Sequence, residues 1–241
     1  MIESKDIPTL FTVWETPVRV HPGVVANLAG LWGMLAWWAG RRQPERPWLL
    51  RLGIGFLETA VLLFADVGHA MAHIVSARFA GGPMDEIVVS SGMPRTLYHD
   101  NNVPPRVHRL RALGGPIFSA LGLLTSLLLR ALAPQGSARR EVSEASCLGH
   151  GFILLGSLVP LPFVDGGSLV KWTLVEAGHS EAEADGLVKT VDLALGTACA
   201  ATGVLVATTS RGKPARQRWL PALGLIAAGG IAIAAALDKI R

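Results

Sequence analysis

The hydrophobic residues of this chain are concentrated in long apolar segments that alternate with short polar ones. About 20 consecutive apolar residues are enough to cross the hydrocarbon core of a bilayer as an α-helix. Six segments approach or exceed this length, the fourth being the shortest: 21–40, 48–80, 107–132, 147–161, 187–209 and 220–237. The pattern therefore predicts an all-α polytopic membrane protein with about six transmembrane segments.

Residues 81–105 interrupt the helical pattern. They contain Gly, Pro and Asn residues that favour turns, and within them lies a short stretch that is typical of a β-strand. This stretch consists of Glu86, Ile87, Val88 and Val89. We expect a small β-like hairpin here, after the second helix and partly at the membrane surface.

The remaining segments show no linker and no internal repeat, so we expect a single integral-membrane domain over residues 1–241. The first 20 residues lack the basic start, apolar stretch and small-residue cleavage site of a signal peptide. They are expected to form a short surface segment.

The composition agrees with a membrane location. Half of the residues are hydrophobic and only 17% are charged, whereas soluble domains carry about 25% charged residues. The net charge of +4 is divided among short Lys/Arg clusters between apolar segments, so a single basic face for nucleic acid is not indicated. We expect a multi-pass integral membrane protein in contact with lipid, with no nucleic-acid partner and with the cell membrane as its location.

The basic loops do not fix the orientation of the chain. Lys and Arg near the ends of the first, third and fifth loops favour a cytoplasmic position for these loops. The second loop also carries several Arg residues and contradicts this alternation. Both cysteines lie in apolar segments, so neither a disulfide framework nor a cysteine zinc site is indicated.

Ionisable residues in the second apolar segment are candidates for function, because charge is costly inside a membrane. His69 and His73 are four residues apart and share one helix face, which is the spacing of helical zinc sites. Asp66 lies three residues before His69. Glu58 lies about 16 Å away along the helix and cannot reach the same metal. Ordinary packing or hydrogen bonding of the two histidines is the alternative.

A second candidate feature is the sequence GSLVPLPFVDGG. Pro160, Pro162 and the glycines after Asp165 break an apolar stretch, and such a break at membrane depth requires protein or a water-filled cavity around it. A carboxylate on this break is a suitable third ligand for a zinc ion held by two histidines, with a fourth position left for water. A simple loop with a solvated Asp165 is the alternative.

A third feature, Gly114-Gly115-Pro116, predicts a close helix crossing. Together the three features resemble the site-2 protease family, the intramembrane zinc metalloproteases. The His-Glu-x-x-His helix of that family corresponds to ADVGHAMAHIVSAR. The later family elements correspond to EIVVSSG, to LGGPIFSA with Ser119 or Ala120 at an Asn position, and to SLVPLPFVDGG with Ser157 at another. The resemblance covers residues 55–176, and Asp-Gly-Gly is its most specific match.

The His-Glu-x-x-His motif departs from the family pattern in both possible registers. If His69 is the second histidine, Ala65 replaces the first and Asp66 replaces the Glu. If His69 and His73 are the two histidines, Ala70 replaces the Glu. The first register keeps a carboxylate and loses a metal ligand, whereas the second keeps the ligands and loses the adjacent base.

The resemblance implies a hybrid site, in which His69, His73 and Asp165 hold zinc and Asp66 acts on the bound water. It also implies a transmembrane protein substrate or partner, part of which unwinds and pairs with the edge of the predicted strand. The strand residues in question are Glu86, Ile87, Val88 and Val89.

Three functions are compatible with these features. The first is zinc-dependent hydrolysis of peptide bonds in or near the membrane. The second is a catalytically inactive relative, a pseudoprotease, that binds membrane partners. The third is a haem-binding membrane protein in which His150 pairs with His69 or His73 as axial ligands.

Overall fold

The computed structural model describes residues 7–90, 94–99, 101–209 and 214–237. The chain divides into two compact units, residues 1–157 and 158–241. The single domain expected from the sequence stays a prediction beside these two compact units. The expected protease-like core, residues 55–176, includes residues of both.

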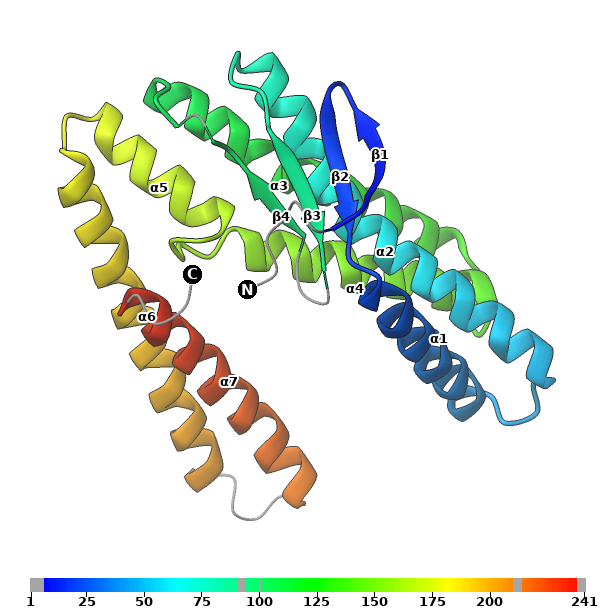
Figure 1. Cartoon of the computed structure of the whole chain (residues 1–241). Coiled ribbons are helices and arrows are strands. Elements are labelled where there is room, and N and C mark those ends of the chain that lie inside the picture. The colour runs from blue at the N-terminus through cyan, green and yellow to red at the C-terminus, as the bar shows by residue number, and fades with distance from the viewer. Residues whose placement is uncertain (1–6, 91–93, 100, 210–213, 238–241) are drawn as a thin grey trace. The chain divides into compact units, whose positions relative to one another are not determined.

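The described part of the first unit contains four helices and a four-stranded sheet (Figure 1). Its elements are β1 (Thr9–Val13), β2 (Thr16–Val20), α1 (Gly23–Arg42), α2 (Trp48–Phe79), β3 (Glu86–Val89), β4 (Arg95–Leu97), α3 (Pro105–Leu132) and α4 (Ala138–Ser157). Prolines precede the helices α2 and α3, where a missing N–H costs nothing. Arginines occupy the last turns of α1, α2 and α3, where positive charge favours the helix dipole.

The strands lie in the order β1-β2-β3-β4. β3 and β4 form the antiparallel hairpin expected after the second helix, whereas β2 and β3 are parallel. The β1–β2 hairpin was not predicted, because residues 1–20 were expected to be a short surface segment. Its turn places Trp14 and Glu15 at φ values of 46° and 73°. Turns with two positive φ values usually use Gly or Asn, so the sequence lacked the ordinary signal.

One face of α2 packs against this sheet. Ala70, Ile74 and Ala77 form an apolar core with residues such as Val18 of β2 and Ile87 of β3. The small alanine side chains allow the sheet to approach the helix closely. This packing fixes the rotation of α2 and therefore the direction of the neighbouring His69 and His73 side chains.

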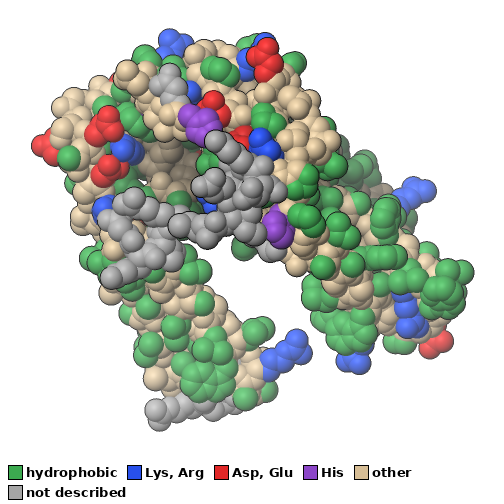
Figure 2. All heavy atoms as spheres, in the orientation of Figure 1, with side chains coloured by type: hydrophobic (Ala, Val, Ile, Leu, Met, Phe, Trp, Pro, Cys, Tyr) green, Lys and Arg blue, Asp and Glu red, His purple; other side chains and the backbone are tan. Residues whose placement is uncertain are grey.

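Four helices of the described chain are long and apolar enough to cross a membrane. They are α2, α3, α6 (Glu181–Thr209) and α7 (Ala215–Ala236). α1 and α4 are not among them, so the expected number of about six spans is not confirmed. Large apolar side chains are exposed on the helices, for example Trp37 (60%) and Phe64 (62%). Figure 2 shows hydrophobic side chains over much of the visible helix surface. Such exposure is favourable in lipid and unfavourable in water.

The described part of the second unit consists of α5 (Asp165–Glu176), α6 and α7. α6 and α7 approach closely through glycines. A side chain added at Gly196 would meet the backbone of Gly229, and one added at Gly203 would meet the backbone of Ala222. Small residues at such crossings are typical of helix pairs in membranes.

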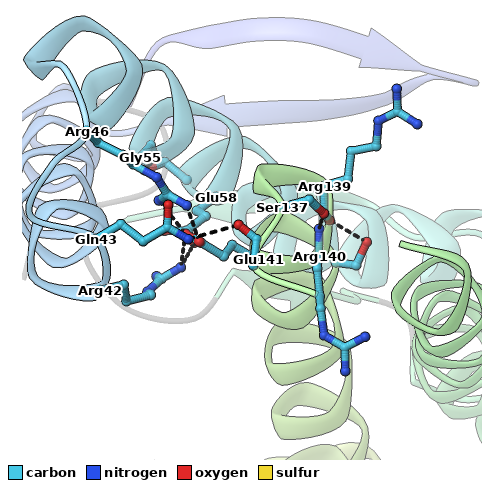
Figure 3. Close-up of polar contacts among 12 residues, drawn as sticks. Arg42, Gln43, Arg46, Gly55, Glu58, Ser137, Arg139, Arg140 and Glu141 are labelled. Carbon is cyan, nitrogen blue, oxygen red and sulfur yellow. Dashed lines mark hydrogen bonds and ion pairs between the residues drawn. The ribbon is translucent and has the colours of Figure 1, made fainter. Parts of the chain in front are cut away.

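A buried ion-pair network connects α1, α2 and α4 within the first unit (Figure 3). Arg42 contacts Glu58 at 2.7 Å and Glu141 at 2.8 Å, and Arg46 forms a two-point contact with Glu141. The Gln43 amide also donates to the carbonyl of Gly136, in the α3–α4 loop. The α1–α2 and α3–α4 loops therefore lie at the same end of this unit.

The network determines the charge state of Glu141, which lies in the first turn of α4, outside the apolar segments. Burial by itself would raise the pKa of this carboxyl. The hydrogen bonds and charges of Arg46 and Arg42 outweigh burial and bring the pKa below its ordinary value. Glu141 therefore stays ionised and paired at neutral pH.

Candidate metal centre

His69 and His73 form a close imidazole pair on α2. Their Nε2 atoms lie 3.3 Å apart, and the ring planes are inclined at 77°. His73 is buried and His69 is half-buried. Two nitrogens bound at ~2.0–2.1 Å to one tetrahedral ion lie about 3.3 Å apart, so the observed separation fits two ligands of one zinc ion.

The opposite nitrogen of each ring is held by α3. His73 Nδ1 lies 2.8 Å from the carbonyl oxygen of Arg111, and His69 Nδ1 lies 2.9 Å from the hydroxyl of Ser119. A carbonyl only accepts, so Nδ1 of His73 carries the proton and Nε2 of the neutral ring keeps its lone pair. Metal-binding histidines are commonly oriented in this way.

Glycines of α3 make this arrangement possible. A Cβ atom at Gly115 would collide with both imidazoles, and one at Gly114 would collide with Ser76 and the carbonyl of Ala72. The Ser76 hydroxyl also donates to the carbonyl of Arg111. The close helix crossing predicted from Gly114-Gly115-Pro116 is thus confirmed, and it brings the Arg111 carbonyl and Ser119 within reach of the rings.

The proline-glycine break of the sequence is a tight turn at the start of the second unit. Side chains added at Gly166 and Gly167 would collide with the carbonyls of Leu158 and Leu161. The turn leads directly into α5, and Asp165 is the first residue of this helix. A helix N-terminus favours the ionised carboxylate, which is the form that binds a metal.

The imidazole pair is formed by His69 and His73. In the register that uses these two histidines as the motif pair, the residue after His69 is Ala70. Ala70 is buried in the apolar core between α2 and the sheet. Asp66 lies one turn before His69 and is half-buried. Among the described residues, Asp66 makes no hydrogen bond or ion pair.

The predicted substrate strand does not have a free edge. Glu86, Ile87 and Val88 of β3 pair with β4, and Ile87, Val88 and Val89 pair with β2. The strand is buried along its whole length, and Glu86 forms an ion pair with Arg19 at 2.8 Å. The prediction that a substrate pairs with the edge of residues 86–89 is therefore wrong, because β2 and β4 occupy the two sides of β3. In the described sheet, the outer strands are β1 and β4.

His150 of α4 is 2% exposed and is packed by aromatic rings. Phe118 and Phe64 lie 5.7 Å and 6.4 Å from it between ring centroids, and the backbone of Gly122 lies directly against the imidazole. A haem bound to His150 would have to displace these groups. The packing thus gives no support to the haem hypothesis.

Comparison with known proteins gives a fold likeness. No protein-family model matches the chain, and no curated protein matches it. The solved structure of a site-2 protease from Methanocaldococcus jannaschii is similar, with a TM-score of 0.54 and 14% sequence identity over 98% of this chain and 95% of that chain. The fold of the chain is therefore site-2-protease-like. The four apolar helices agree with an integral membrane location.

Two contacts at the imidazole pair were not predicted from the sequence. Ser119 was noted only as a substitute at an Asn position, and its bond to His69 was not foreseen. The role of Arg111 belongs to its backbone carbonyl, for which a side-chain motif gives no signal. The spacing of Gly115 and Ser119, four residues apart on one face of α3, was the available indication.

Gly115→Ala is expected to weaken zinc binding by roughly tenfold or more, an effect of the size seen when outer contacts of metal ligands are removed. The added methyl group would collide with both Nε2 atoms and force the rings apart. Zinc affinity measured by competition with a chromogenic chelator tests this. Gly53→Ala on α2 is the matched control, since a Cβ there meets nothing within 4 Å. Equal affinities for the two variants would contradict the assigned geometry.

Proposed function

We propose that this chain is a multi-pass, site-2-protease-like protein of the cell membrane in which His69, His73 and Asp165 hold Zn²⁺. The observation that carries the proposal is the imidazole pair, with 3.3 Å between the Nε2 atoms and both Nδ1 atoms held by α3. Asp165 is assigned as the third ligand from its place in the Asp-Gly-Gly element and from the preference of zinc for nitrogen and carboxylate ligands.

Peptide hydrolysis at this site depends on a carboxylate other than the family Glu. When bound, zinc polarises a carbonyl and lowers the pKa of a water molecule toward ~7. Asp66 takes a proton from water and returns it to the leaving amine. Because Asp is one methylene shorter than Glu, and a displacement of about 1 Å can cost roughly 100-fold in rate, we expect slow turnover of a transmembrane protein substrate.

A second candidate function is binding without hydrolysis. The observation that favours it is Ala70, which stands at the Glu position and is buried in the apolar core. In that case the chain is a pseudoprotease that binds a transmembrane partner, and zinc has a structural role.

Asp66→Asn is expected to reduce cleavage of a model transmembrane substrate by about 100-fold or more, because the amide cannot accept the proton. Cleavage is measured with purified protein in proteoliposomes, with and without a zinc chelator. Asp185→Asn, which changes an exposed carboxylate paired with Lys171, is the control and keeps the parent rate.

An unchanged rate in Asp66→Asn would remove Asp66 from the mechanism. No cleavage by zinc-loaded parent protein, together with crosslinking of the same substrate to it, would establish the second candidate instead.

A further inference from the structure

The loop between α1 and α2 contains a pocket that the proposed zinc chemistry does not use. Its volume is about 460 Å³, and it is lined by Trp37, Gly40, Arg41, Pro44 and Arg51. Two ionisable side chains line the pocket, Arg41 from the last turn of α1 and Arg51 from the first turn of α2.

The two pocket arginines differ from the other two arginines of this region in their partners. Arg42 and Arg46 are neutralised by the buried carboxylates of the ion-pair network. Among the described residues, neither Arg41 nor Arg51 has an acidic partner. Exposed Glu45, in the same loop, forms no ion pair with either of them.

Arg51 is held in place while several of its donors stay unused. Its Nε donates to the carbonyl of Arg46 at 2.8 Å, and one Nη2 hydrogen is donated to the carbonyl of Pro44 at 2.5 Å. A guanidinium has five N–H donors, so three remain for a ligand. Arg41 lies over the Trp37 ring at 5.7 Å from its centroid, which orients its guanidinium without neutralising it.

The surroundings of the pocket are those of a membrane interface. Trp37, Trp38 and Trp48 are all exposed near the loop, and tryptophans are enriched at the level of lipid headgroups. Figure 2 shows Lys and Arg side chains near this end of the α1–α2 pair, next to hydrophobic surface. A ligand at this place can therefore have an anionic head in the pocket and acyl chains along the apolar helices.

We propose that this pocket is a binding site for the phosphate headgroup of an anionic phospholipid. Arg41 and Arg51 supply the positive charge and the N–H donors, and a guanidinium matches phosphate oxygens in geometry. Basic pockets between membrane helices are a known means of lipid headgroup recognition. The site is independent of the zinc centre and does not require hydrolytic activity.

Native mass spectrometry of the delipidated full chain, titrated with phosphatidylglycerol, tests the proposal. Arg41→Gln is expected to weaken binding about five- to tenfold, since one basic residue contributes on the order of that factor at an anionic membrane surface. Arg139→Gln is the matched control. Arg139 is exposed in α4 at the same end of the unit but does not line the pocket, and its variant is expected to bind within about twofold of the parent.

Two further ligands identify the source of the phosphate. Phosphatidylcholine, whose headgroup has no net charge, is expected to bind more weakly than phosphatidylglycerol, and inorganic phosphate is expected to compete only weakly. Equal effects of Arg41→Gln and Arg139→Gln would overturn the site. Competition by inorganic phosphate as effective as that of the lipid would assign the pocket to free phosphate and overturn the lipid headgroup.

Discussion

Purified parent protein is expected to contain about one zinc ion per chain, and His69→Ala or His73→Ala is expected to reduce this to near zero. Each substitution removes one of the two nitrogens that face each other at 3.3 Å. A mononuclear site with three protein ligands loses most of its affinity when one is removed. Inductively coupled plasma mass spectrometry on detergent-purified protein measures the zinc content directly.

Controls separate ligand loss from general damage to the fold. His99→Ala removes an exposed histidine whose described contact is made by its backbone N–H, to Asp85, and is expected to leave the zinc content unchanged. Asp165→Ala is expected to lower the zinc content. Zinc retained in Asp165→Ala and lost in His69→Ala would remove Asp165 from the ligand set. Zinc retained in both histidine variants would refute the assigned centre.

Glu141→Ala is expected to lower the free energy of unfolding of the first unit by about 3 kcal/mol or more. Removal of one partner of a buried ion pair leaves an uncompensated charge, which typically costs 3–5 kcal/mol. Here it leaves Arg46, which is 8% exposed, without its partner. Thermal unfolding in detergent, monitored by circular dichroism, measures this loss of stability as a lower midpoint temperature of unfolding.

Glu144→Ala is the matched control for this prediction, since Glu144 lies one turn further along α4. Its side chain is 43% exposed and pairs with Arg130 at 3.1 Å and with Arg140 at 3.3 Å. Because water reaches this carboxylate, a cost of about 0–1 kcal/mol is expected. Similar losses in both variants would contradict the role of burial. The Glu141 contribution is present above its ordinary pKa and is lost as the pH falls through its lower pKa in the folded state.

Features set by local spacing could be predicted from the sequence. The lengths of the apolar segments predicted the long helices, although α1 and α4 are not among the helices that are long and apolar enough to cross a membrane. The four-residue spacing of His69 and His73 gave the imidazole pair, because a helix places such residues on one face. The small residues Gly114 and Gly115 gave the close crossing with α2, since any side chain there would prevent it.

Features set by long-range contacts or unusual turns could not be predicted from the sequence. The β1–β2 hairpin turns at Trp14 and Glu15 with positive φ and no glycine. Its strand β2 then occupies an edge of β3 that the sequence had left open to a substrate. The ion-pair partner of Glu58, Arg42 from another helix, was not identified from the sequence. Such pairings depend on tertiary packing and have no local sequence signature.

X-ray absorption spectroscopy at the zinc edge of the purified protein tests whether His69 and His73 bind the same zinc ion. The expected spectrum shows nitrogen and oxygen ligands at ~2.0–2.1 Å from zinc, with the outer-ring scattering of two imidazoles. In a protein without zinc, the same 3.3 Å separation fits an N–H···N hydrogen bond from His69 to His73, with the Ser119 hydroxyl donating to His69 Nδ1. Absence of zinc, or a zinc ion bound by sulfur or by fewer than two imidazoles, would refute the assigned metal centre.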